Sequence, residues 1–254
     1  MSLPELSIII PAYNEESRLP RALASIRDYL AAQGLTGDRA EVIVVDDGSK
    51  DGTARVVQEW IGELPTLRLV ANGVNRGKGY SVRHGMLEAR GRIALFTDAD
   101  LSAPIEEAGK ILAALEQGNE VAIGSRALDR SLISVHQSVL RETAGKIFNG
   151  FVRLITGLQF HDTQCGFKAF VREPARIVFE QQRIERFGFD PEILFLAQHH
   201  GLRAVEVSVR WAHDPATKVH VYRDSVLMFA DLLVIRWNWL LGRYPPQRRA
   251  QAAG

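Results

Sequence analysis

The chain has 254 residues, 46% of them hydrophobic, which is enough to bury a substantial core in one large α/β domain or two small ones. Lysine and arginine (31) nearly balance aspartate and glutamate (30), which argues against a protein that binds nucleic acid through its overall charge. The single cysteine, Cys165, excludes an intrachain disulfide and is typical of a reducing compartment, so we expect a cytoplasmic protein.

Targeting and membrane-spanning segments are not expected. The first residues lack a basic region followed by a long apolar stretch, since Pro11 and Asn14 interrupt the apolar run, so we predict no signal peptide. The most apolar later segment, Val226 to Leu241, contains Asp231 and Arg236, so we predict no helix that crosses a bilayer.

In the first half of the chain, short β-rich runs alternate with helical patterns, which is typical of β-α-β units. The expected buried strands are Leu6 to Ile10, Glu41 to Val45, Leu67 to Val70, Ile93 to Thr97 and Val121 to Gly124. Helical apolar faces occur at Leu19 to Leu30, at Val56 to Ile61 and after Pro104. These patterns predict a single α/β domain with a Rossmann-like, mostly parallel sheet flanked by helices.

The pattern changes after about Ser125. A helix is expected at Val139 to Thr156, then a loop and strand at His161 to Val171, then further helices. We predict one catalytic domain over residues 1–243, in which residues 1–125 bind the activated substrate and residues 126–243 supply the acceptor side. Residues 244–254 are expected to form a flexible tail.

The strongest local motif is Asp98-Ala99-Asp100, which follows the run Ile93 to Thr97. Ligands of open α/β sheets bind beyond the carboxyl ends of the strands, so these two carboxylates are expected at such an end. Mg²⁺ and Mn²⁺ prefer oxygen ligands and often bind through one or two carboxylates plus substrate phosphates. The motif therefore predicts a metal and diphosphate site; the alternative is a solvated acidic turn.

A second acidic pair, Asp46-Asp47, ends the run Glu41 to Val45 and should lie along the same sheet edge. The carboxylate of Asp47 can accept hydrogen bonds from a base or a ribose. Ser49 or Asp51 would alternatively serve only as an N-cap for the following helix, a role that is compatible with ligand binding by Asp47.

The first strand leads into Pro11-Ala12-Tyr13-Asn14-Glu15, where the proline turns the chain out over the same edge. The ring of Tyr13 can stack on a nucleobase and Glu15 can hydrogen-bond it. The alternatives are a packed surface aromatic residue and an acidic residue in the first turn of a helix.

Asn75-Arg76-Gly77-Lys78-Gly79 is a cationic, glycine-containing loop before a helix, and its lysine can approach a phosphate. The segment lacks the spacing of a Walker P-loop. No G-x-G-x-x-G motif follows an expected strand, which argues against a hydride-transferring Rossmann enzyme. The seven histidines show no spacing typical of a zinc site.

In combination, these motifs resemble those of the family 2 glycosyltransferases. The ordered set is Ile9-Ile10-Pro11-Ala12-Tyr13-Asn14-Glu15-Glu16, Val44 to Thr53, Asn75 to Gly79 and Thr97 to Asp100. The later Asp162 to Lys168 and Phe187 to Asp190 resemble the dolichyl-phosphate glucose and mannose synthase branch, and Trp211 to Val219 and Met228 to Leu233 are closer to the glucose type. The resemblance covers about Leu6 to Arg236.

This resemblance implies a GT-A fold and metal-dependent transfer of a hexose from a nucleoside diphosphate sugar to a polyprenyl phosphate, with inversion at the anomeric carbon. UDP-glucose is the favoured donor and GDP-mannose the alternative. The implied donor-binding residues are Pro11, Ala12, Tyr13, Glu15, Asp47, Lys78, Asp98, Ala99 and Asp100, of which Asp98 and Asp100 hold Mg²⁺ or Mn²⁺. Where the mannose branch has a glutamine that assists the metal, this chain has Ser102, so the third ligand stays open.

A phosphate acceptor needs cationic donors, of which bidentate guanidinium groups are the strongest. Arg126 and Arg141 match positions that the family uses, and Arg126 is counted with Asp98 and Asp100 as catalytic. Lys168 and Lys218 are further candidates for the acceptor phosphate. The alternative for Arg141 and the two lysines is a solvated surface cation.

The segment Ser225 to Leu241 contains Trp237 and Trp239 near Arg236 and Arg243, a mix suited to a helix in the headgroup region of a membrane. We therefore expect peripheral attachment to the cytoplasmic face of a membrane; the alternative is a helix packed on the sheet. Two other functions stay open: a family 2 enzyme with a soluble saccharide acceptor, and a non-catalytic module that binds nucleotide sugars.

Overall fold

A computed structural model describes residues 3–135, 139–212 and 221–246, with the backbone alone for residues 139–142 and 221–224. Its main feature is a seven-stranded sheet in the order β3-β2-β1-β4-β7-β5-β8. The strands are β1 (Leu6–Ala12), β2 (Ala40–Asp46), β3 (Leu67–Ala71), β4 (Ile93–Thr97), β5 (Val121–Ser125), β7 (Phe167–Val171) and β8 (Ala204–Ser208). Short strands β6 (Ile133–Val135) and β9 (Trp211–Ala212) form a separate pair.

The five strands expected in the first half are all present, and the mostly parallel sheet is confirmed. Parallel pairing joins β1 to β2 and β4, β2 to β3, and β5 to β8, whereas β7 runs antiparallel between β4 and β5. The antiparallel direction of β7 was not predicted. It follows from the chain path, because β7 is reached through the second half of the chain and not through a β-α-β crossover.

The helices are α1 (Leu19–Ala32), α2 (Thr53–Trp60), α3 (Lys78–Glu88), α4 (Ala108–Glu116), α5 (Val139–Thr156), α6 (Arg172–Gln181), α7 (Phe189–His199) and α8 (Val221–Leu240). The helix expected after Pro104 begins with a 3₁₀ turn, Ile105–Glu107, before α4. The bounds predicted for α5 agree with the structure.

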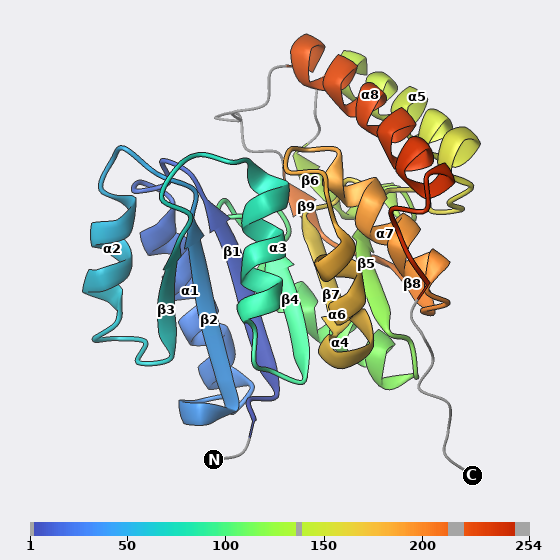
Figure 1. Cartoon of the computed structure of the whole chain (residues 1–254). Coiled ribbons are helices and arrows are strands. Elements are labelled where there is room, and N and C mark those ends of the chain that lie inside the picture. The colour runs from blue at the N-terminus through green and yellow to red at the C-terminus, as the bar shows by residue number, and fades with distance from the viewer. Residues whose placement is uncertain (1–2, 136–138, 213–220, 247–254) are drawn as a thin grey trace.

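Alternate residues of the central strands face two separate cores, as expected for a sheet that is covered on both sides. Ile8 and Ile10 of β1 pack in the core that contains the apolar faces of α1, α2 and α4, whereas Ile9 packs in the core under α3, α6 and α7. The three layers, helices on each side of one sheet, are visible in Figure 1.

Helices α5 and α8 lie side by side at one end of the molecule and cover α7 more than the sheet (Figure 1). Leu232 and Ile235 of α8 are fully buried in the second core. Within the described residues, no helix is long and apolar enough to cross a membrane.

The tail expected from residue 244 does not begin there. Tyr244 is 2% exposed, and its hydroxyl donates to Glu192 Oε1 at 2.6 Å. Gln181 also donates to the carbonyl of Pro245 at 2.7 Å. A buried aromatic ring with a satisfied hydroxyl stabilises the packed state, so this segment is ordered against α7. Residues 247–254 lie outside the described residues.

Candidate active site

The carboxyl ends of β2, β1 and β4 lie next to one another at one edge of the sheet. Ala12 of β1 is in register with Asp46 of β2, and Ile9 is in register with Phe96 of β4. The acidic pairs that follow β2 and β4 therefore lie along one edge, as predicted, and the Pro11-Ala12 segment separates them.

The loops that follow β1 and β2 are tied together by hydrogen bonds. The backbone N–H of Asn14, which has a φ of 53°, donates to Ser49 Oγ at 2.9 Å, and that of Glu15 donates to Thr53 Oγ1 at 2.8 Å. These bonds order the segment that carries Tyr13 and Glu15 over the sheet edge. Ser49 and Thr53 thus hold this loop, whereas the N-cap of α2 is Gly52 and not Ser49 or Asp51, as considered from the sequence.

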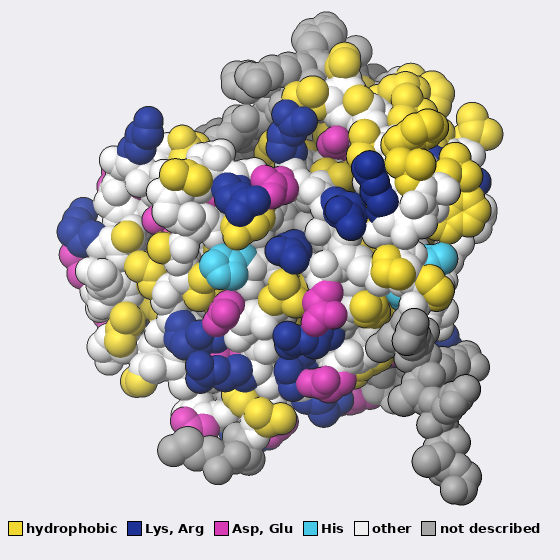
Figure 2. All heavy atoms as spheres, in the orientation of Figure 1, with side chains coloured by type: hydrophobic (Ala, Val, Ile, Leu, Met, Phe, Trp, Pro, Cys, Tyr) yellow, Lys and Arg dark blue, Asp and Glu magenta, His cyan; other side chains and the backbone are white. Residues whose placement is uncertain are grey.

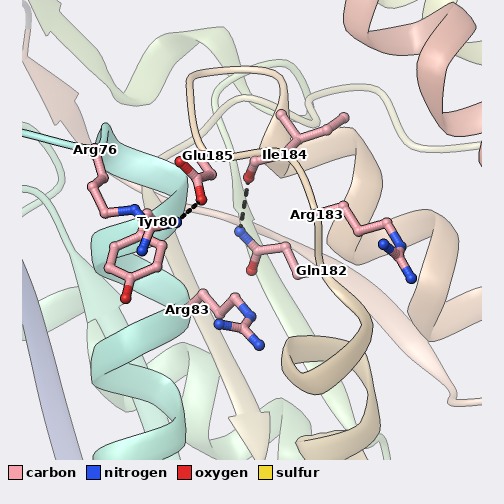
Figure 3. Close-up of a pocket in the computed structure, with 7 residues that line it drawn as sticks. All are labelled: Arg76, Tyr80, Arg83, Gln182, Arg183, Ile184 and Glu185. Carbon is pink, nitrogen blue, oxygen red and sulfur yellow. Dashed lines mark hydrogen bonds and ion pairs between the residues drawn. The ribbon is translucent and has the colours of Figure 1, made fainter.

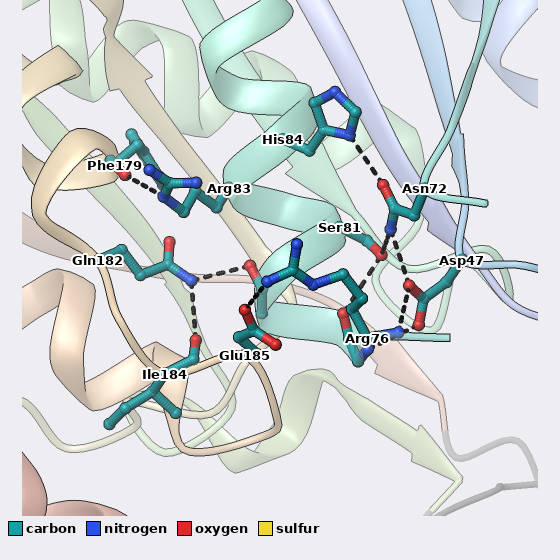
Figure 4. Close-up of polar contacts among 12 residues, drawn as sticks. Asp47, Asn72, Arg76, Ser81, Arg83, His84, Phe179, Gln182, Ile184 and Glu185 are labelled. Atoms are coloured by element: carbon teal, nitrogen blue, oxygen red, sulfur yellow. Dashed lines mark hydrogen bonds and ion pairs between the residues drawn. The ribbon is translucent and has the colours of Figure 1, made fainter. Parts of the chain in front are cut away.

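Asp47 is 3% exposed and orders the segment that leads into α3. Its Oδ1 accepts from the Asn72 side-chain amide at 2.7 Å and from the Arg76 backbone at 3.0 Å, and its Oδ2 accepts from the Gly77 backbone at 2.8 Å (Figure 4). A carboxylate has about four acceptor sites, so these three bonds leave limited capacity for a ligand. The carboxylate of Asp47 instead fixes the position of the neighbouring Lys78.

Lys78 is the first residue of α3, behind Gly77 with a φ of 110°. Its Nζ lies 2.5 Å from Asp98 Oδ1 at the end of β4. Burial acts to lower the pKa of Lys78, but the carboxylates of Asp98 and Asp190 raise it above its ordinary value. The lysine is therefore charged at neutral pH, and it is brought to the acidic motif as a counter-ion.

Asp98-Ala99-Asp100 forms a tight turn. The N–H of Leu101, which has a φ of 47°, donates to the carbonyl of Asp98 at 3.1 Å, and the N–H of Ser102 donates to Asp100 Oδ1 at 2.9 Å. Asp100 is exposed at the surface, but partial desolvation raises the pKa of its carboxyl, and the negative charge of Asp98 raises it further. The turn therefore brings together two carboxylates that repel each other.

The donor set of this turn fits a hard divalent cation. The turn offers two carboxylates. Within the described residues, no group of three or more His, Cys, Asp or Glu side chains is arranged to hold a metal. A site with two protein carboxylates suits a cation such as Mg²⁺ that completes its shell with substrate phosphate and water oxygens. Ser102 contacts Asp100 through its backbone.

Gly166 allows the loop before β7 to approach Asp98. A Cβ atom at this position would lie 2.1 Å from Asp98 Oδ2 and 2.7 Å from its Cγ. Gly166 belongs to the motif Asp162 to Lys168, but the local sequence pattern gives it no role, because nothing in that pattern shows that β7 pairs with β4. Any side chain here would displace the carboxylate.

Arg126, expected to bind the acceptor phosphate, forms a bidentate ion pair with Asp162. Its Nε and Nη2 donate to Asp162 Oδ2 and Oδ1 at 2.7 and 2.8 Å. Burial acts to raise the pKa of Asp162, but Arg126 lowers it to about 2. The pair leaves Nη1 of the guanidinium available for an anion. Arg126 also lies 5.3 Å from the ring centroid of Trp211.

Lys168 is placed inside the protein, away from any surface where an acceptor could bind. It is fully buried, and its Nζ donates to the carbonyl of Cys165 and to Asp190 Oδ1, both at 2.5 Å. A buried cation is stable only when paired, so contact with an acceptor phosphate would leave Asp190 uncompensated. Lys168 and Asp190 therefore form a buried ion pair that supports the site. The sequence alone indicated no role for Asp190.

The remaining acceptor candidates are not placed by the structure. The side chain of Arg141 and the whole of Lys218 lie outside the described residues, although the backbone at position 141 belongs to α5.

Across these contacts, three basic side chains face four carboxylates, so the group carries one net negative charge. The members are Lys78, Lys168 and Arg126, with Asp98, Asp100, Asp162 and Asp190. Asp98, Asp162 and Asp190 each have a basic partner at hydrogen-bond distance. Asp100 is the carboxylate that a further cation would neutralise.

The family model Glycosyl transferase family 2 matches residues 7–179. A dolichyl-phosphate beta-glucosyltransferase of Dictyostelium discoideum is 37% identical over 93% of this chain and 75% of that protein. One from Drosophila melanogaster is 39% identical over 94% of this chain and 77% of that protein.

Solved structures support the same fold. Glucosyl-3-phosphoglycerate synthase from Mycobacterium tuberculosis aligns with a TM-score of 0.64 at 17% identity, over 92% of this chain and 80% of that chain. A mannosyltransferase from Pyrobaculum calidifontis, in complex with GDP-Man and Mn²⁺, aligns with a TM-score of 0.59 at 21% identity, over 95% of this chain and 65% of that chain.

Proposed function

Because the chain belongs to glycosyl transferase family 2 and is a glycosyltransferase, we propose that it transfers glucose from a nucleoside diphosphate sugar to a polyprenyl phosphate. The dolichyl-phosphate beta-glucosyltransferases that it resembles along most of its length support the choice of sugar and acceptor. UDP-glucose is the favoured donor, and GDP-mannose is the competing donor in the test below.

The observation that carries the proposal is the convergence of Lys78, Asp98 and Asp100 at the edge where β1 and β2 also end. A nucleoside diphosphate needs a surface for its base, hydrogen-bond acceptors for its ribose and cations for its diphosphate. The end of β1 and the loop after it would supply the surface for the base and acceptors for the ribose through Pro11, Ala12, Tyr13 and Glu15, and Asp47 after β2 would add its remaining acceptor capacity. Lys78 supplies a cation, placed at a helix N-terminus, where anions are favoured.

Asp98 and Asp100 would hold Mg²⁺ or Mn²⁺, with Ala99 between them. Bound there, the ion would neutralise charge on the departing diphosphate. Lys78 adds a second positive charge on the same side, and its ammonium would turn from Asp98 toward the diphosphate as the nucleotide sugar binds. Such pre-placed charge contributes most where charge develops in the transition state.

The acceptor phosphate attacks C1 of the sugar from the face opposite the leaving diphosphate, which inverts the anomeric carbon. A phosphate monoester with a second pKa of about 6 is largely ionised at neutral pH, so this chemistry needs no strong base. Arg126 is held by Asp162 in one orientation, and its Nη1 would position the attacking phosphate. Arg141 and Lys218 remain candidates for the same phosphate.

The acceptor is a lipid, and one surface of the protein suits a membrane. The exposed apolar side chains of α5 and α8 form what we name the α5–α8 apolar surface: Ile147, Phe151, Leu154, Val226, Phe229, Leu233, Val234, Trp237, Trp239 and Leu240. Figure 2 shows hydrophobic side chains, in yellow, gathered at the top right of the molecule, where α8 lies in Figure 1. Patches of this kind mark interaction sites. We propose that this surface attaches the enzyme peripherally to the cytoplasmic face of a membrane.

The test is transfer of label from UDP-glucose or GDP-mannose to polyprenyl phosphate, with Mg²⁺ or Mn²⁺, followed by extraction into an organic phase. We expect label from UDP-glucose in that phase. Label from GDP-mannose alone would overturn the choice of glucose. If label appears only on an added soluble saccharide, the lipid acceptor is wrong.

A further inference from the structure

A second candidate binding site lies beside α3, and neither Lys78 nor Asp98 lines it. Two adjoining cavities, of about 330 and 460 Å³, open between α3 and the loop that joins α6 to α7. Both are lined by Arg76, Arg183, Ile184 and Glu185. We name them together the arginine groove; Figure 3 shows the residues that line the first cavity.

The arginine groove carries a net positive charge. Its lining includes four arginines, Arg76, Arg83, Arg183 and Arg186, against the carboxylates of Glu185 and Asp231. Positive charge concentrated in a concave site attracts anions more strongly than the same charges spread over a flat surface. The ligand that suits this groove is therefore an anion.

The arginines keep free donors for such an anion. Arg83 Nε donates to the carbonyl of Phe179 at 2.8 Å, and Arg183 Nη2 donates to the carbonyl of Arg243 at 3.2 Å (Figure 4 shows the former). Each guanidinium has five N–H groups, so these bonds leave most donors available. Arg76 pairs with Glu185 and lies over the ring of Tyr80 at 3.6 Å.

The loop that forms one wall of the groove is rigid. Glu192 of α7 is fully buried, and its carboxylate accepts from the backbone N–H groups of Arg183 and Ile184 at 2.8 to 3.1 Å. Gln182 donates to the carbonyls of Gly79 and Ile184 at 2.8 and 3.1 Å. These buried bonds fix the backbone from which Arg183 projects, so the groove is preformed.

The groove adjoins the α5–α8 apolar surface. Val234 of α8 lines the second cavity and is 43% exposed as part of that surface. In Figure 2, dark-blue side chains lie directly beside the yellow patch. A membrane in contact with the apolar surface would place its headgroups at the level of the groove, because basic side chains next to an apolar face lie at that depth.

We propose that the arginine groove binds the phosphate of an anionic phospholipid, an inference that rests on the proposed attachment through the α5–α8 apolar surface. Guanidinium groups bind phosphate oxygens in a bidentate manner, and basic residues near an anionic leaflet strengthen membrane binding. The groove is distinct from the proposed acceptor and donor sites, since neither the Arg126–Asp162 pair nor the Lys78–Asp98 pair lines either cavity.

The test is flotation with vesicles of phosphatidylcholine alone and of phosphatidylcholine mixed with phosphatidylserine. We compare the full chain with Arg183→Ala/Arg186→Ala and with a control of equal charge change, Arg39→Ala/Arg203→Ala, whose side chains lie at the opposite edge of the sheet and are 54% and 68% exposed. We expect the groove variant to lose about tenfold or more of the affinity for anionic vesicles and the control to lose much less. Affinity for phosphatidylcholine alone should not change.

Glu185→Gln provides a change in the opposite direction. It removes the carboxylate that competes for Arg76, so the affinity for anionic vesicles should rise several-fold. A decrease would contradict the proposal even if the double variant is poorly folded.

Other outcomes separate the groove from the proposed function. The groove proposal is wrong if both double variants lose the same affinity for anionic vesicles, or if phosphatidylserine gives no gain in affinity over phosphatidylcholine. Either result leaves the proposed membrane attachment in place. If no vesicle is bound but inorganic phosphate raises the melting temperature of the parent chain and not of the groove variant, the ligand is a soluble phosphate and the lipid is wrong. Transfer to polyprenyl phosphate in detergent tests the enzyme function separately.

Discussion

The ammonium of Lys78 lies 2.5 Å from Asp98 Oδ1, where the start of α3 meets the end of β4. Without a bound nucleotide sugar the two charges neutralise each other. With a nucleotide sugar bound, the lysine would face its diphosphate. The contact keeps a cation next to the position of the leaving group, so that its charge is already in place when the proposed chemical step begins.

Lys78→Met should therefore lower kcat by about 100-fold, because it removes a charge that acts on the developing diphosphate. Initial rates with saturating donor measure this effect. Lys110→Met is the control, since that lysine also pairs with a carboxylate, Glu107, but on α4. If the two variants are equally active, Lys78 has no part in the reaction.

Gly166→Ala tests the close approach between the loop before β7 and Asp98. The new Cβ would lie 2.1 Å from Asp98 Oδ2, so the carboxylate must move. We expect kcat/KM to fall tenfold or more, which corresponds to about 1.4 kcal/mol of transition-state stabilisation. Circular dichroism checks that the fold is kept. Gly109→Ala, where a Cβ meets nothing within 4 Å, should keep full activity.

The first half of the site was predictable because its strands are buried on both faces and appear as continuous apolar runs. Each run ends in the polar residues that bind ligand, so the order of Asp47, Lys78 and Asp98 along the chain already implied a shared edge. The sequence did not show that the carboxylate oxygens of Asp47 accept hydrogen bonds within the protein, because the partners Asn72 and Gly77 lie 25 and 30 positions away.

The second half was harder to predict because its contacts depend on β7 running antiparallel between β4 and β5. That placement buries Lys168 beside Asp190, whereas the sequence suggested a cation at the acceptor site. Charged residues are rarely buried unless paired, and the partner of Lys168, 22 positions away on helix α7, carries no local signal.

The Arg126–Asp162 pair predicts a pH dependence of stability. Burial acts to raise the pKa of Asp162, but Arg126 lowers it to about 2, below the ordinary value of 3.8. The pair therefore adds about 2 kcal/mol that is present above pH 4 and is lost as the pH falls toward 2.

Urea unfolding between pH 5 and pH 3, measured for the parent chain and for Asp162→Asn, tests this dependence, since the variant cannot titrate there. We expect the variant to be less stable at pH 5 and to show a shallower decrease in unfolding free energy below pH 4. Asp38→Asn, at an exposed position, should follow the parent. Parallel curves for the parent chain and Asp162→Asn would contradict the assignment.

The α5–α8 apolar surface predicts membrane binding that depends on its side chains. Leu233 and Trp237 are 52% and 60% exposed, so glutamate at both positions should leave the fold intact. Burying such side chains contributes about 1.5 to 3 kcal/mol each, so flotation with phosphatidylcholine vesicles should fall tenfold or more. Leu3→Glu/Ile61→Glu, two exposed positions elsewhere, is the control. If the variant with glutamate at positions 233 and 237 still floats with the vesicles, α8 does not contact the membrane.

Asp100 carries the last prediction because it is the carboxylate of the site that lacks a basic partner at hydrogen-bond distance among the described residues. Partial desolvation and the charge of Asp98 raise its pKa, so a divalent cation would relieve both effects. Asp100→Ala should abolish turnover that depends on Mg²⁺ or Mn²⁺, and Asp100→Asn, which keeps the size but not the charge, should be nearly as inactive. Rates measured after chelation, against increasing metal concentration, test this dependence.

Glu106→Gln, at an exposed carboxylate in the segment before α4, is the control and should respond to metal like the parent chain. Near-normal turnover of Asp100→Ala removes this carboxylate from the mechanism, whereas rates that chelation leaves unchanged remove the metal itself.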